Sequence, residues 1–272
     1  MLSYRNRSFS LLDCTLRDGG YYNSWDFESS LVDAYLAAMN VSSVDIVEVG
    51  FRFFDNESYK GAFAYCRDSY LEQMETLPDK KLAVMINAAD LFDGSKVDLF
   101  RLGVLFPVRK SESRIDIVRI ACRKHEVMQL SQVISELENL GYEVILNLMQ
   151  IADCSDSELA LIVKFVDDSG ASVFYFADST GSLMPKDVNE KIKKIFECGL
   201  SLPLGVHLHD NLGLALANAI SAIESGATYI DATMLGMGRG PGNVKTEEAL
   251  MLWGSESGCT SEPVVDCVQQ YF

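Results

Sequence analysis

The sequence has no apolar run that approaches the ~18 residues needed to cross a bilayer. Its first residues, MLSYRNRSFSLLDCTL, also lack the long apolar core of a signal peptide. The seven cysteines include no CxxC pair, a scatter typical of reduced thiols in a cytosolic protein. These absences exclude a membrane-spanning chain, and we expect a cytoplasmic protein with no membrane partner.

The chain also lacks a basic cluster, and its formal net charge is −16. Acidic residues are spread along the sequence without a long run, which indicates a solvated acidic surface. Phosphate backbones need basic neutralisation, so this balance excludes broad nucleic-acid binding. A small anionic substrate is not excluded, because one local cation can dominate a pocket.

No Pro/Ser-rich linker or low-complexity segment divides the chain, and we expect one domain over residues 1–272. Short apolar runs, typical of strands buried on both faces, alternate with amphipathic segments typical of helices. The predicted strands are 9–15, 44–51, 81–88, 115–122, 142–150, 171–179, 202–210 and 227–235. The predicted helices are 28–40, 125–141, 155–170, 185–199, 213–226 and 245–258.

Eight strand–helix units of this kind predict an α/β protein, a (β/α)8 TIM barrel, with its core over 9–256. A doubly wound open sheet is the alternative fold. Residues 257–272 are expected to form a closing C-terminal helix, or to mark the point where a larger protein continues. Two helix ends carry specific signals: Ser155 with Glu158 at the start of one helix, and Gly141 at the end of another.

In such barrels chemistry lies at the carboxyl ends of the strands, and polar side chains gather at most of these ends. We expect five of them to bind a small-molecule substrate: Asn87, Arg119, Asn147, Asp178 and Thr180.

Histidine is scarce, and two of only three histidines stand together in VHLHDN. Residues two apart on a strand share a face, so His207 and His209 point the same way and could reach one ion. Structural or substrate hydrogen bonding is the alternative role. Asp18, just beyond the first strand, favours the metal interpretation as a third ligand.

Other candidates have structural alternatives. Arg17 could form a rim ion pair, Glu48 and Arg119 could pair with each other inside the barrel, Asp178 could cap the turn through STG, and Asn147 could be a satisfied core amide.

Three motifs in order, DCTLRDGG, HLHDNLGLALANA and GMGRGPGN, resemble the metal-dependent lyase and aldolase superfamily. Its members include 4-hydroxy-2-oxovalerate aldolase, 3-hydroxy-3-methylglutaryl-CoA lyase (HMG-CoA lyase) and the isopropylmalate and homocitrate synthases. The resemblance covers roughly residues 9–256 and implies a TIM barrel. It also implies a divalent ion held by Asp18, His207, His209 and Asn243, and an Arg17 that stabilises charge on a substrate oxygen.

The resemblance further aligns Glu48 with an acidic residue of these enzymes, so Glu48 joins Arg17 and Tyr21 as a catalytic candidate. The sequence departs from individual members of the superfamily at three positions. Tyr21 stands where the aldolases have an acid/base histidine, the last glycine loop lacks the cysteine of HMG-CoA lyases, and Gly20 stands where the synthases have a glutamate.

The resulting hypothesis is a carbon–carbon lyase acting on a 2-oxo acid or hydroxy-oxo acid. The superfamily favours Mg²⁺ or Mn²⁺, while Zn²⁺ or Co²⁺ would also suit oxygen and imidazole ligands. Tyr21, or a water held by Glu48 or Asp178, is the expected base. The alternatives are an acyl-CoA-dependent condensing or HMG-CoA lyase-like enzyme, a metal-dependent hydrolase barrel, and a non-catalytic metabolite-binding barrel. The chain could act as a homo-oligomer or as part of a larger protein.

Overall fold

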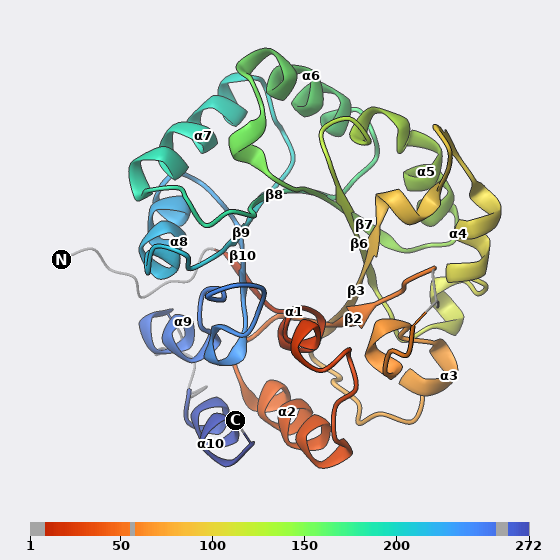
Figure 1. The fold of residues 1–272 in the computed structure, drawn as a ribbon, viewed down its shortest axis with the longest axis vertical. Coiled ribbons are helices and arrows are strands. Elements are labelled where there is room, and N and C mark those ends of the chain that lie inside the picture. The colour runs from red at the N-terminus through yellow and green to blue at the C-terminus, as the bar shows by residue number, and fades with distance from the viewer. Residues whose placement is uncertain (1–8, 55–57, 254–260, 272) are drawn as a thin grey trace.

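In the computed structural model, which describes residues 9–54, 58–253 and 261–271, eight parallel strands close into a barrel (Figure 1). Leu12 of the first strand pairs with Ile46 on one side and Asp231 on the other, which closes the ring. The TIM barrel is therefore confirmed and the open sheet is wrong. In barrel order the strands are β1 (Ser10–Asp13), β10 (Tyr229–Ala232), β9 (Leu204–Leu208), β8 (Val173–Asp178), β7 (Glu143–Leu148), β6 (Ile117–Cys122), β3 (Lys81–Asn87) and β2 (Ile46–Phe51).

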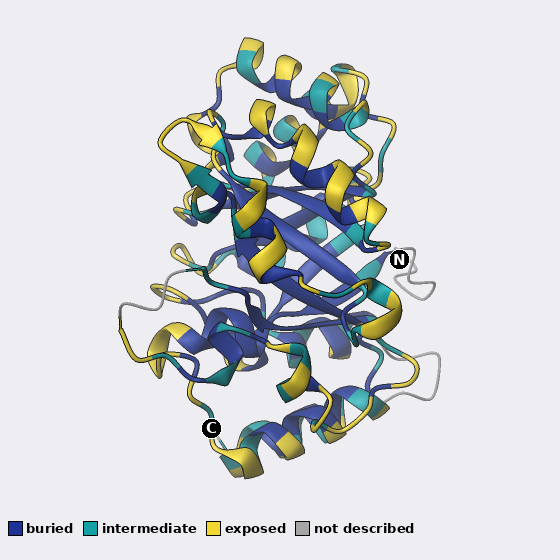
Figure 2. Cartoon of the chain, turned by 90° about the vertical axis from the view of Figure 1, so that its right-hand side faces the viewer, coloured by how far each residue is buried: buried dark blue, intermediate teal, exposed yellow. Residues whose placement is uncertain are grey.

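Helices surround the barrel, with buried faces toward the strands and exposed faces toward solvent (Figure 2). The longer helices are α2 (Ser29–Val41), α4 (Leu99–Leu105), α5 (Ser131–Asn139), α6 (Asp156–Asp167), α7 (Pro185–Glu197), α8 (Ala215–Glu224), α9 (Thr246–Trp253) and α10 (Glu262–Tyr271). Short elements at the loops include α1 (Thr15–Asp18), α3 (Asp68–Leu71), the 3-10 turns η1 (Gly19–Tyr22), η5 (Val127–Gln129) and η6 (Ile151–Asp153), and the hairpin strands β4 (Phe92–Asp93) and β5 (Lys96–Val97). Within the described residues no helix is long and apolar enough to span a membrane.

Most predicted helices are confirmed within a few residues, and their ends show why. Ser155 caps α6 through the backbone N–H of Glu158, whose carboxylate returns the bond. The helix predicted from residue 125 begins only at Ser131, because residues 127–129 form the 3-10 turn η5. Helix α4 was not predicted. The expected closing helix is α10, which packs against α2, while residues 257–260 lie outside the described part of the chain.

The strands alternate between two cores. Side chains such as Leu11 and Val118 face the helices, whereas Leu12 and Ile117 fill the barrel interior. The interior apolar floor is formed by Leu12, Cys14, Ile46, Ala83, Ile117, Ile145, Val173 and Tyr175. Polar side chains stand above this floor, toward the carboxyl ends of the strands, which positions the site.

Candidate active site

Asp18, His207 and His209 meet at the carboxyl end of the barrel. Asp18 ends α1, which follows β1 directly, while His207 lies on β9 and His209 just beyond it. All three are buried, and one possible ligand atom from each lies within 4.8 Å of the others. The two imidazole centroids are 5.0 Å apart with ring planes at 82°. The structure thus brings together the three residues that the sequence singled out as ligands.

Asn243 joins this cluster from the last glycine loop. Its Nδ2 donates to Asp18 Oδ2 at 2.5 Å and to the Met237 carbonyl at 3.0 Å. Its Oδ1 is buried and has no hydrogen-bond partner among the described residues. Gly238 permits this approach, because a Cβ there would lie 2.3 Å from Asn243 Nδ2 and 2.7 Å from Asp18 Oδ2.

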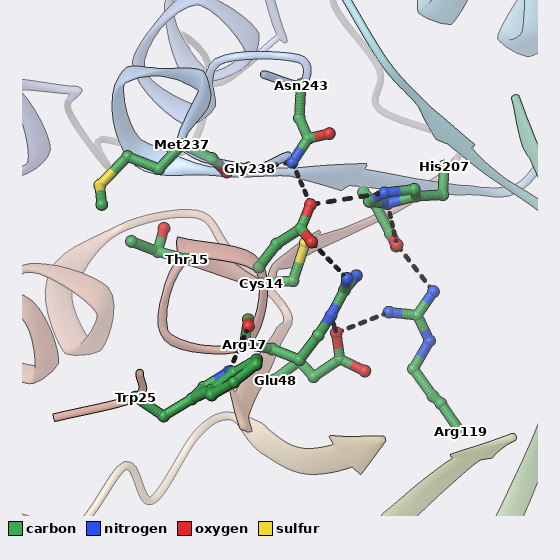
Figure 3. Close-up of polar contacts among 12 residues, drawn as sticks. Cys14, Thr15, Arg17, Trp25, Glu48, Arg119, His207, Met237, Gly238 and Asn243 are labelled. Atoms are coloured by element: carbon green, nitrogen blue, oxygen red, sulfur yellow. Dashed lines mark hydrogen bonds and ion pairs between the residues drawn. The ribbon is translucent and has the colours of Figure 1, made fainter. Parts of the chain in front are cut away.

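Beneath the cluster, buried ion pairs run around the barrel interior (Figure 3). Arg17 donates from Nη1 to Asp18 at 2.8 Å and from Nε to Glu48 at 2.7 Å. Arg119 donates to the same Glu48 oxygen at 3.1 Å and to Asp231 at 2.7 Å.

The chain of contacts returns to the cluster through His207. Its Nδ1 lies 3.0 Å from Asp231 Oδ2, and its Nε2 lies 3.6 Å from Asp18 Oδ2. A carboxylate only accepts hydrogen bonds, so Nδ1 carries a proton and donates to Asp231, which directs Nε2 at Asp18. Asp231 thereby fixes both the tautomer and the direction of His207.

These contacts perturb several pKa values. Burial alone would raise the pKa of Asp18 and of Asp231. At Asp18 the Arg17 guanidinium, the two imidazoles and the hydrogen bond from Asn243 together exceed the effect of burial and lower the pKa. At Asp231 the Arg119 guanidinium, His207 and Arg17 together lower the pKa to about 2. Burial, aided by neighbouring His207, lowers the pKa of His209 to about 4. At neutral pH the cluster thus offers ionised Asp18 and Asp231 and a neutral His209.

The cluster faces a chamber of about 40 Å³ whose lining includes Arg17, Asn87 and Asn147 from the predicted set. Arg17 Nη2 and Asn147 Oδ1 are buried without hydrogen-bond partners among the described residues. Asn87 is held toward Asp90 by a 3.4 Å contact. Arginine and amide groups with unused hydrogen-bonding capacity thus surround the space beside the cluster.

Tyr21 also lines the chamber, on the turn η1 after Asp18, and is 40% exposed. Its ring contacts Trp25 and Phe51 edge-on, and the Arg239 guanidinium lies 5.1 Å from its centroid. Burial raises the pKa of the phenol, although Arg17 and Arg239 oppose this effect. Tyr21 therefore keeps its proton at neutral pH.

Two predicted substrate-binding residues are instead used by a turn. The Asp178 carboxylate accepts from the backbone N–H groups of Ser182 and Leu183 and from the Thr180 hydroxyl. Thr180 is exposed and also contacts the Ser182 hydroxyl. Neither lines the chamber, because these bonds hold both side chains on the loop after β8. Asp178 thus makes the contacts of the turn-capping alternative, and its predicted part in substrate binding stays a prediction.

Arg119 and Glu48 also do not line the chamber, since both are fully buried in the ion-pair layer below it. They pair with each other, as the structural alternative expected, while the predicted roles of Arg119 in substrate binding and of Glu48 in catalysis stay predictions.

Sequence reasoning missed two residues of the site. Asp231 is an acidic residue inside the apolar run of β10, and that isolated charge was the available signal. Arg239 is the single cationic residue of the glycine loop GMGRGPGN, and that charge was the available signal.

The chain belongs to the HMGL-like family, whose model matches residues 8–261. It is therefore a carbon–carbon lyase of a metal-dependent family. It is 31% identical over 270 residues to the 4-hydroxy-2-oxovalerate aldolase of Carboxydothermus hydrogenoformans, covering 97% of this chain and 77% of that protein.

Solved structures agree on the fold. The N-terminal domain of a Bacteroides vulgatus protein described as an aldolase has a TM-score of 0.82 and 34% identity, covering 96% of this chain and 85% of that chain. The hydroxymethylglutaryl-CoA lyase of Pseudomonas aeruginosa has a TM-score of 0.77 at 16% identity, covering 98% of this chain and 92% of that chain, a likeness of fold alone.

Proposed function

We propose that this protein is a divalent-metal-dependent aldolase that cleaves a 4-hydroxy-2-oxo acid into pyruvate and an aldehyde. The observation that carries the proposal is the cluster of Asp18, His207 and His209 beside the unpaired Nη2 of Arg17. The named activity of the relatives, 4-hydroxy-2-oxovalerate aldolase, supports the same substrate class.

The residues present fit a divalent cation. Asp18, His207 and His209 would hold it, with the unpartnered Oδ1 of Asn243 as a fourth donor. The three carboxylates of the ion-pair layer exceed its two guanidiniums by one charge, which favours a cation at this place. Mixed oxygen and imidazole donors suit Mg²⁺ or Mn²⁺, and Zn²⁺ or Co²⁺ are the alternatives. When bound, such an ion supplies a Lewis acid for a 2-oxo acid.

Arg17 is positioned to stabilise the negative charge that develops on the keto oxygen as the bond between carbons 3 and 4 breaks. Glu48 and Asp18 hold two of its nitrogens, so Nη2 is aimed without further reorganisation. Asn147, whose Oδ1 is unpaired, is a second group that can orient the substrate. The fixed guanidinium would bind the charged oxygen of the transition state more strongly than the neutral oxygen of the substrate. Such a difference in binding is what raises kcat.

Three ionisable residues of the inner chamber, Asp18, His207 and His209, are assigned to the metal, and the arginines keep their protons. Tyr21 is then the residue of that lining available for proton transfer. In condensation it would donate its phenolic proton to the aldehyde oxygen, and in cleavage it would accept the proton of the 4-hydroxyl group. The electron pair of the broken bond forms the enolate, with its charge on the keto oxygen beside Arg17, and a proton from solvent water adds to carbon 3 to complete pyruvate. Because the pKa of Tyr21 is raised, the cleavage rate should climb as the pH increases above neutral.

The condensing-enzyme alternative is less well supported. A Cβ on Gly20 would lie 2.0 Å from Trp25 Cδ1, so the glutamate that the resemblance places there in synthases has no room. Trp25 is itself fixed, since its Nε1 donates to the Arg17 carbonyl at 2.8 Å.

The test is pyruvate release from racemic 4-hydroxy-2-oxopentanoate by the metal-loaded protein, followed by a coupled lactate dehydrogenase assay. We expect pyruvate and acetaldehyde in equal amounts, and we expect Tyr21→Phe to lose the alkaline rise in rate. Condensation of acetyl-CoA with a 2-oxo acid, without hydroxy-oxo acid cleavage, would contradict the proposal.

A further inference from the structure

A second chamber of about 290 Å³ opens beside the cluster of Asp18, His207 and His209, over the loops that follow β6, β7, β8, β9 and β10. Four residues, Met149, Ser179, His209 and Arg239, line both this outer chamber and the inner one. The two spaces therefore adjoin each other, and a long substrate held at the cluster would extend toward the outer chamber.

The charge of the outer chamber is opposite to that of the protein. The chain carries 39 acidic against 23 basic residues, yet the lining includes Arg123 and Arg239 and no acidic residue. Among the described residues, neither guanidinium forms an ion pair with a carboxylate. Arg239 lies over the ring of Tyr21, a contact that does not use its N–H groups, and the described residues provide no hydrogen-bond acceptor for them.

Neutral donors complete the lining. Gln150 adopts a left-handed conformation, with φ 57° and ψ 48°, and its backbone N–H is bound by Ser179 Oγ at 3.1 Å. Such a conformation in a residue other than glycine is unfavourable and is often retained at ligand sites. The side chain of Asn211 packs against Gly181 and faces the same space.

We propose that the outer chamber binds a second anionic group, a carboxylate or a phosphate, on the aldehyde half of the substrate. This inference rests on the proposed aldolase function and narrows its substrate class. The inner chamber takes the 2-oxo acid end, and Arg123 with Arg239 forms charge-assisted hydrogen bonds to the distal anion. The preferred substrate is therefore a 4-hydroxy-2-oxo acid with charge at both ends.

Kinetics of condensation with pyruvate test this assignment through matched aldehydes. Succinic semialdehyde is compared with 4-oxobutanamide, its neutral isostere, and glyceraldehyde 3-phosphate is compared with glyceraldehyde. We expect kcat/KM to favour the anionic member of at least one pair by about 10- to 150-fold, the range for a charge-assisted hydrogen bond. The pair with the larger ratio identifies the carboxylate or the phosphate.

Arg123→Met and Arg239→Met should each reduce that ratio toward one. Arg109→Met is the matched control: Arg109 is exposed, precedes β6 at the opposite end of the barrel and contacts the Asn139 carbonyl. An equal preference for neutral and anionic aldehydes in the wild type, or an unchanged ratio in both chamber variants, overturns the inference.

A binding measurement separates this inference from the proposed function. Glycerol 3-phosphate and succinate are titrated calorimetrically into the metal-loaded protein and its Arg123→Met/Arg239→Met variant. If no aldehyde reacts and no hydroxy-oxo acid is cleaved, the proposed function fails. Binding of either anion that is lost in the double variant then still supports the anion chamber, and no binding of either overturns it.

Discussion

Replacing Asp231 by asparagine removes the charge that holds His207 in place. Asp231 is buried, at 1% exposure. Its Oδ2 accepts hydrogen bonds from Arg119 at 2.7 Å and from His207 at 3.0 Å. Asparagine keeps an acceptor oxygen, so both bonds persist, but each now has a neutral acceptor and about half its former strength. The expected loss is about 1.5–3 kcal/mol in the free energy of unfolding.

The functional effect of Asp231→Asn follows from the tautomer. A neutral amide binds the Nδ1 proton of His207 less tightly and makes Nε2 a weaker ligand. Loss of such an orienting carboxylate raises the Kd for a metal by about 10- to 100-fold. Titration with Mn²⁺, followed by electron paramagnetic resonance, measures the Kd, and urea unfolding of the metal-free protein measures stability.

Asp13→Asn is the matched control for this prediction. Asp13 is fully buried on the neighbouring strand β1, where it accepts from Tyr35 at 2.7 Å and from Thr246 at 2.5 Å, away from the chamber. It should lose stability and keep its Mn²⁺ affinity. Equal Mn²⁺ affinity in Asp231→Asn and wild type would refute the reasoning.

Three further changes probe the same site. Arg17→Lys keeps a charge but cannot bind Asp18 and the substrate oxygen together, so kcat for pyruvate release should fall by about 10²–10³-fold while the Mn²⁺ Kd changes little. A loss confined to metal affinity would assign Arg17 a structural role. In chelator, His209 stays neutral in the folded state down to about pH 4, whereas in the unfolded chain it binds a proton below about pH 6.5. The unfolded state then binds more protons, so stability falls from pH 6.5 toward pH 4, by about 2 kcal/mol at pH 5 from this residue. Urea unfolding should show a shallower pH slope for His209→Gln, and equal slopes would contradict this account. Gly238→Ala should displace Asn243 and weaken Mn²⁺ binding, and an unchanged Kd in the same titration would remove Asn243 from the ligand set.

Much of the fold could be predicted from the sequence, because strands buried on both faces appear as short apolar runs. The run 171–179 contains β8 and the run 202–210 contains β9. Residues 125–130 were harder, because an amphipathic pattern continues through the 3-10 turn η5 into α5. Periodicity alone does not separate these two kinds of turn.

The cluster could be predicted because its members lie at strand ends that a barrel must bring together. The ion-pair layer could be predicted only in part: the sequence offered the pair of Glu48 with Arg119 as an alternative, but not the contacts of Asp231 with Arg119 and His207. Asp231 is a single acidic residue in the apolar run of β10, and no local pattern in the sequence names its partners on other strands. The sequence offered two roles for Asp178, substrate binding and turn capping, and only the structure shows the hydrogen bonds that its carboxylate accepts from the following turn.

The central claim, that His207 and His209 hold the catalytic metal, is tested most directly by chelation and return of Mn²⁺ while bound metal and pyruvate release are measured together. The wild type should lose both in excess chelator and regain both at one Mn²⁺ per chain. The His207→Ala/His209→Ala variant should regain neither, while His125→Ala, at the exposed third histidine, should behave as wild type. Pyruvate release that persists in excess chelator, or in the double variant, would contradict the account.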